Sequence, residues 1–270
     1  WRWSFMVIAA VSAIIASAAW AFLRGPWDNP RRQRRDADGG TNKPQGRIQT
    51  RELMVFFALG LGMFLKHGPL MGYQGLWGVP YFMDVYQMTK VQAGSLLMWI
   101  SIGYIVGGPV IGRVSDRQGL SLRSLLIGTS ALYWLSWIPL AFMTEGGSRM
   151  LLCATSLLMG TTGSASGVVA HSLSSRHSGA GRSGTGLGIV NGLTLLGGAV
   201  FQPLMGLTID RSLAAGLTAT VAYARTFQMV FAATLGMVLI SLLVHDPAAQ
   251  SGVKRSGTSF VTEEANKIGI

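Results

Sequence analysis

A stripe of polar side chains crosses the apolar stretch 53–83. At 100° per helical residue, His67, Gln74 and Tyr81 fall within about 40° of one another, and Trp77 lies one turn beyond Gln74. Amide, hydroxyl and indole groups can hydrogen-bond a polar ligand, and the imidazole of His67 can also exchange a proton near neutral pH. We therefore predict a ligand-binding face here, with a purely structural role for the same side chains as the alternative.

Lys66 directly precedes this stripe. An ionisable group inside a long apolar helix is costly and usually faces a bundle interior or a watery cavity. Two roles are therefore open for Lys66: contact with the ligand, or a long side chain that extends to the nearer polar surface while His67 pairs with a neighbouring carbonyl. Gly-Pro and Val-Pro pairs in the same stretch predict that the helix is interrupted beside the site.

A second polar face lies within 183–209. Asn191, Thr194, Gly198 and Gln202 are spaced three or four residues apart, and Asn191 and Gln202 fall within about 20° of each other on a helix. We predict that Asn191 and Gln202 complete the binding set. The alternative is that such polar groups bond their own backbone or a neighbouring helix.

The elements that hold these residues follow from composition. Of 270 residues, 49% are hydrophobic and 12% charged, against about 25% charged in a soluble domain. This excludes a disordered chain and disfavours a soluble enzyme, while a single cysteine excludes a disulfide framework. Windows of at least 20 residues, enough for a helix to cross a ~30 Å hydrocarbon core, are free of charge or broken only by Lys66. They are Trp3–Leu23, Leu53–Met83, Val91–Gly112, Ser124–Thr144, Met150–Ser175, Ser183–Ile209 and Thr226–His245. The fold class is therefore an all-α polytopic membrane protein with about seven transmembrane helices.

The basic residues predict its orientation. Sixteen of the 22 lie in 24–51, 113–123, 176–182 and the C-terminal tail, and five lie at the opposite junctions. The positive-inside rule then places the 24–51 loop and the tail in the cytoplasm, and we expect a bacterial inner membrane. This asymmetry explains the net charge of +11 without a nucleic-acid partner.

Small residues recur at helix-packing spacing in 103–112 and in 184–192. In lipid, such residues let helix backbones approach closely. Both stretches are therefore expected either to pack closely against neighbouring helices or to serve as sliding surfaces in a protein that changes shape.

A polar motif follows the Val91–Gly112 window. Gly112, Asp116, Arg117 and Gly119 form a G-x-x-x-D-R-x-G string that resembles the signature loop of the major facilitator superfamily of secondary transporters. In that family the loop occurs between helices two and three and again between eight and nine, and a basic linker followed by two spans matches the second position. The resemblance implies a conformational-switch loop that stabilises one access state. An ordinary capped turn is the alternative, and the family's usual basic pair after the motif is missing here.

The resemblance also implies a domain order and a function. Its segments are 1–23 (last helix of the N-terminal lobe), 24–51 (cytoplasmic linker), 52–245 (C-terminal six-helix lobe) and 246–270 (cytoplasmic tail). A start at Trp1 leads us to expect a fragment lacking most of the N-terminal lobe. The expected activity is secondary transport of a small polar or anionic solute by alternating access, coupled to a proton or counter-solute, in a carrier that is monomeric when complete. No catalytic residues, metal or cofactor are expected. A non-transporting membrane sensor or scaffold on the same fold is the alternative.

Overall fold

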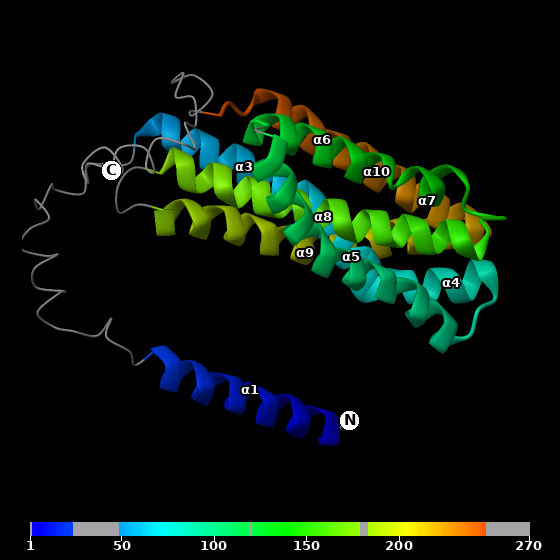
Figure 1. Cartoon of the computed structure of the whole chain (residues 1–270). Helices are drawn as coiled ribbons and strands as arrows, with labels where there is room; N and C mark the ends of the chain where they lie inside the picture. Colours follow the sequence, from blue (N-terminus) through cyan, green and yellow to red (C-terminus); the bar gives the residue numbers. More distant parts are fainter. Residues whose placement is uncertain (1, 24–48, 119, 179–182, 247–270) are drawn as a thin grey trace, which may run out of the picture. The chain divides into compact units, whose positions relative to one another are not determined.

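The computed structural model describes residues 2–23, 49–118, 120–178 and 183–246, with the side chains of 2–5, 8, 21–23 and 116–118 excepted. Throughout these ranges the regular elements are helices (Figure 1). The chain divides into two compact units, Trp1–Arg47 and Ile48–Ile270. The first unit contains α1 (Arg2–Leu23).

The second unit is a bundle of long helices. Its elements are α3 (Thr50–Gly72), η2 (Tyr73–Trp77), α4 (Gly78–Tyr86), α5 (Lys90–Gln118), α6 (Leu122–Leu135), α7 (Ile138–Phe142), α8 (Arg149–His177), α9 (Ser183–Ala214) and α10 (Ala219–Leu243). Figure 1 shows them running along a common direction, with α6, α7 and α10 on one side. In the closest pairings, α3 packs against α9 and α5 packs against α8.

Six candidate membrane spans, by length and apolar composition, are present in the described part of the chain. They are Thr50–Tyr86, Lys90–Ser115, Leu122–Phe142, Arg149–His177, Ser183–Ala214 and Ala219–Leu243. Each coincides with one of the predicted windows, and α1 contributes a shorter apolar stretch, Ala9–Trp20. The chain is therefore an integral, multi-pass membrane protein, as its composition predicts.

Helix ends shift from the predicted windows where capping groups set them. The last span begins at Ala219, ahead of the predicted Thr226, because Thr218 Oγ1 accepts a hydrogen bond from Val221 N at 3.4 Å. Ser148 caps α8 in the same way through Leu151 N at 3.2 Å. Such caps satisfy backbone donors that the first helical turn leaves unpaired.

Small residues bring α5 and α8 together. A Cβ on Gly103 or Gly107 would meet backbone atoms of α8, and a Cβ on Gly160 would meet Ile100 O. The predicted packing of 103–112 is thus confirmed for Gly103 and Gly107. It is wrong for Gly184, Gly188 and Gly192, where a Cβ would meet open space around the described residues, whereas a Cβ on Gly186 would meet Phe56 and Ser174.

The helices α3 and α9 meet through a glycine contact that the spacing did not indicate. A Cβ on Gly68 would lie 2.6 Å from Gly197 O, and a Cβ on Gly197 would lie 2.6 Å from Phe64 O. The two helix backbones can lie this close together because both residues at the contact are glycines. The contact fixes the separation of the two helices that carry the predicted binding residues.

One end of the bundle is filled by an aromatic cluster, which we define as Tyr73, Tyr81, Phe82, Trp137 and Phe227. All five side chains are buried. Ring centroids are 4.9 Å apart for Tyr81 and Phe227 and 5.7 Å apart for Tyr73 and Trp137. Edge-to-face pairs of this kind contribute about 0.5–1.5 kcal/mol each, so the cluster joins η2 and α4 firmly to α10 and to the turn between α6 and α7.

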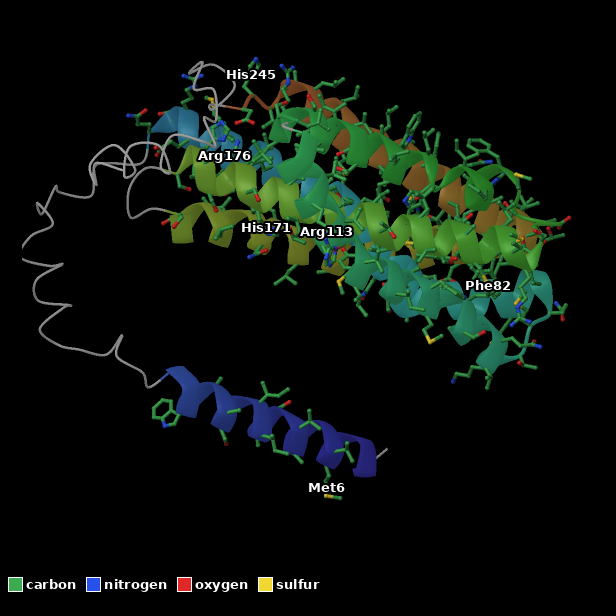
Figure 2. The ribbon with its side chains drawn as sticks, viewed as in Figure 1. Met6, Phe82, Arg113, His171, Arg176 and His245 are labelled. Carbon is green, nitrogen blue, oxygen red and sulfur yellow. The ribbon has the colours of Figure 1, made fainter. Side chains whose placement is uncertain are left out.

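A charged contact ties the helices together at the other end. The buried Asp246 carboxylate, just past α10, accepts a hydrogen bond from Leu122 N at 3.0 Å and pairs with Arg176 at 3.2 Å. Figure 2 shows Arg176 and His245 at the end of the bundle opposite Phe82. Asp246 therefore links the end of α10 to the start of α6 and to α8.

Candidate functional site

The first span of the bundle is irregular at its middle. Helix α3 runs through Pro69 without ending, and the interruption is the π-helical turn η2, where Gly78 N–H donates to Tyr73 O. A π-turn holds more residues than an α-turn, and such turns are frequent at functional sites. Residues after η2 are therefore rotated away from the face that a continuous α-helix would give them.

Two of the predicted residues from this span line one cavity. This cavity of about 360 Å³, which we call the amide cavity, lies between α3, η2, α5 and α9. Its polar lining is His67, Gln74, Ser101, Tyr104 and Gln202. The structure thus brings Gln202 of the second predicted face next to His67 and Gln74 of the first.

Hydrogen bonds orient the lining of the amide cavity. Gln74 Nε2 donates to Ser101 Oγ at 3.0 Å, which leaves the Gln74 carbonyl oxygen and the Ser101 hydroxyl proton for a ligand. The Gln202 side chain makes no hydrogen bond with any part of the chain that the structure describes. This cavity therefore offers uncharged donors and acceptors.

A second cavity of about 550 Å³ adjoins the first, and we call it the lysine cavity. His67 and Tyr104 line both cavities, and His67 Nδ1 lies 3.3 Å from Tyr104 Oη. The remaining polar lining comes from Lys66, Ser164, His171, Asn191 and Thr194. The His67–Tyr104 pair therefore forms the partition between two chambers of one site.

Asn191 is held by a partner from the neighbouring helix. Its Oδ1 lies 3.0 Å from His171 Nε2, so the imidazole donates in this pairing and the Asn191 amide N–H groups stay available. Helix spacing alone assigned Asn191 and Gln202 to one face. In the structure they line different chambers, Asn191 in the lysine cavity and Gln202 in the amide cavity.

Lys66 does not extend to the membrane surface. Its side chain is fully buried, and Nζ donates to Gly163 O on α8 at 2.6 Å. Lys66 lines the lysine cavity together with Gly163 and Gly167, which have no side chains to cover it. A Cβ on Gly167 would lie 3.4 Å from Lys66 Nζ. The alternative that the Lys66 side chain extends to the polar surface is thus wrong, because its ammonium group bonds a backbone carbonyl of α8 instead.

Trp77 and Tyr81 lie outside both chambers, as expected from the rotation at η2. Trp77 Nε1 donates to Gln202 O at 2.9 Å, and its ring lines a different cavity with Pro203 and Asp210. Tyr81 is fully buried in the aromatic cluster, and its hydroxyl donates to a backbone carbonyl, Thr144 O, at 3.3 Å. Trp77 thus holds the backbone of a cavity residue, whereas Tyr81 belongs to the aromatic cluster.

The described motif residues, Gly112, Asp116 and Arg117, lie at the end of a helix and not in a loop. Helix α5 continues through Gln118, so Gly112, Asp116 and Arg117 are helical, and Gly112 has open space beside it. The side chains of Asp116 and Arg117, and Gly119 as a whole, lie outside the described residues. The residues just before Gly119 include no signal that ends a helix, and this accounts for the continuation of α5 through Gln118.

Four polar lining residues were not named in the sequence analysis: Ser101, Tyr104, Ser164 and His171. Ser101 and Tyr104 are polar, three residues apart on an otherwise apolar span, and that spacing is the signal that could have identified them. His171 lies toward the Arg176 end of α8 (Figure 2). Its contribution depends on its contact with Asn191, which the sequence does not encode locally.

Comparison with known proteins gives one match. The family model of the Major Facilitator Superfamily matches residues 59–267, which include both chambers and most of the bundle. No curated protein was found to match the chain.

Proposed function

Because the chain belongs to the major facilitator superfamily and is a membrane transporter, we propose that it carries a small polar or anionic solute by alternating access. The observation that supports this most is the pair of adjoining chambers within the bundle, lined by polar groups from α3, η2, α5, α8 and α9. Polar groups at membrane depth usually face a bundle interior or a substrate path. The solute binds across both chambers, with His67 and Tyr104 between its two ends.

The Ile48–Ile270 unit serves as one lobe of this carrier, and the preceding helix and linker connect it to the other. In this proposal the complete protein is a monomer in a bacterial inner membrane, and a proton or a counter-solute drives the cycle. The basic residues favour a cytoplasmic position for the end that carries Arg176 and Arg123. The motif at Gly112, Asp116, Arg117 and Gly119 then acts at the cytoplasmic side to set the balance of access states.

Uptake by proteoliposomes tests the proposal. The complete protein is reconstituted and challenged with labelled small carboxylates, sugars and amino acids. Gln74→Ala should raise KM by about 2–10-fold, the equivalent of one lost hydrogen bond, while expression stays normal. Gln228→Ala is the matched control, because that glutamine lies on α10 and donates to Ala141 O at 3.2 Å outside both chambers.

Each outcome is informative. Saturable uptake that depends on Gln74 and not on Gln228 supports the carrier. An unchanged KM for Gln74→Ala removes Gln74 from the site. Solute binding without any flux contradicts transport and points to a sensor or scaffold.

A further inference from the structure

Lys66 is a buried basic residue for which the described part of the bundle offers no acidic partner. The ion pair recorded among the described residues is Arg176 with Asp246, at the far end of α8. Neither cavity has an aspartate or glutamate in its lining. Lys66 Nζ carries three donor hydrogens, and the structure gives it one acceptor, Gly163 O. A buried charge in this setting is stabilised by a partner of opposite sign.

The ammonium group of Lys66 lies close enough to the lysine cavity to make its electrostatic potential positive. Two glycines one helical turn apart, Gly163 and Gly167, line this cavity beside Lys66, and a Cβ on Gly167 would lie 3.4 Å from Lys66 Nζ. On the cavity side, the amide of Asn191 has free N–H groups, oriented by His171. The lysine cavity therefore combines a positive potential with hydrogen-bond donors, which is the chemistry that recognises an oxyanion.

The adjoining amide cavity has the opposite character. Gln74, Ser101 and Gln202 offer uncharged hydrogen-bonding groups. A solute that spans both chambers would place one charged end beside Asn191 and an uncharged, hydrogen-bonding body beside Gln74.

We propose that the solute is a small hydroxylated organic monoanion, with its carboxylate in the lysine cavity and its hydroxyl groups in the amide cavity. One lysine balances one negative charge, which favours a monocarboxylate over a dianion. Lys66 is fully buried and acts through its field, so it is a positioning residue, while Asn191 and His171 touch the carboxylate. This inference rests on the proposed function, because it assigns the solute of the same site.

Calorimetric titration of the protein in lipid nanodiscs tests this. The probes are acids paired with the alcohols of the same skeleton: lactate with 1,2-propanediol, glycerate with glycerol, and gluconate with glucitol. We expect at least one acid to bind about tenfold or more tightly than its alcohol, because a unit charge acts over a few ångströms at an effective dielectric near 20. Lys66→Gln should remove this preference and leave affinity for the alcohol unchanged.

Three further variants keep the test decisive. Lys66→Arg retains the charge and should retain the acid preference. Asn191→Asp adds a negative charge to the chamber without altering the buried lysine, and should abolish acid binding even where Lys66→Gln fails to fold. Lys90→Gln removes an exposed lysine at the start of α5 and should change nothing.

The outcomes separate this inference from the proposed function. Equal affinity for acids and alcohols, or an acid preference that survives Lys66→Gln and Asn191→Asp, overturns the monoanion. If a neutral solute is transported and Lys66→Gln leaves its uptake unaltered, the carrier stands and the monoanion fails. If an acid binds through Lys66 but no flux occurs, the binding chemistry stands and the transport proposal fails.

Discussion

The glycine contact between α3 and α9 can be tested by a single methyl group. Gly197→Ala places a Cβ 2.6 Å from Phe64 O, 3.1 Å from Phe64 Cα and 3.2 Å from Gly68 Cα. All three atoms belong to the backbone, so no side-chain rotation relieves the overlap. The two helices must separate by several tenths of an ångström.

Overpacking of this kind costs typically about 1–3 kcal/mol. We expect a cost at the upper end of this energy range, because the new methyl group faces rigid backbone atoms. A unit of this size loses about 2–4 °C in Tm per kcal/mol, so we expect Gly197→Ala to lower Tm by about 6–12 °C. Solute affinity should fall as well, because α3 carries His67 and α9 carries Asn191 and Gln202.

Thermal unfolding of the detergent-solubilised protein measures the effect. Gly188→Ala is the matched control in the same helix, because a Cβ there meets nothing within 4 Å. Without a clash, alanine should be neutral or stabilise the helix by up to about 1 kcal/mol. A Tm for Gly197→Ala within a degree of Gly188→Ala would refute the close approach of α3 and α9.

Three further substitutions test separate features. Asp246→Ala should destabilise the bundle by about 3 kcal/mol, because it leaves the Arg176 charge without its partner, and an unchanged midpoint in thermal unfolding would exclude a structural role for the pair. Gly206→Ala places a Cβ 2.5 Å from the ring of Trp77, so the indole should move and its fluorescence maximum shift; an identical spectrum and solute affinity would contradict the packing. Asp116→Asn should alter the balance of inward and outward states, measured as the labelling rate of a cysteine placed in the amide cavity, and equal labelling would remove the switch role proposed for Asp116.

The number and type of the helices in the bundle were predictable from charge alone. Long uncharged windows must form helices in lipid, because backbone groups there have no water to bond. The packing of Gly103 and Gly107 also followed from spacing. These features depend on local sequence and on the solvent.

The composition of the two chambers was only partly predictable. His67 precedes η2 and Gln74 lies within it, so the two side chains keep the predicted direction around the helix axis. Tyr81 follows η2, and its side chain is turned into the aromatic cluster. A π-turn depends on tertiary packing, and an extrapolation at 100° per residue has no means of detecting it. Sequence reasoning also had no basis for pairing Lys66 with a carbonyl 97 residues away on α8.

The angular position of a residue around a helix axis does not by itself predict which cavity that residue lines. Asn191 and Gln202 share a helical face, but they are eleven residues apart, roughly 16 Å along the axis at 1.5 Å per residue. That separation places them at opposite ends of the joint site. Angular proximity must be combined with axial distance before residues are grouped.

The aromatic cluster also determines where a solute can pass. Its five rings pack against one another at one end of the bundle and fill the space between η2, α4, α10 and the turn that joins α6 to α7. A hydrated molecule moving between the described helices there would have to displace several buried rings at once. Among the described helices the rings therefore close the bundle at this level, and in the proposed carrier the solute would move along the side that holds the two chambers.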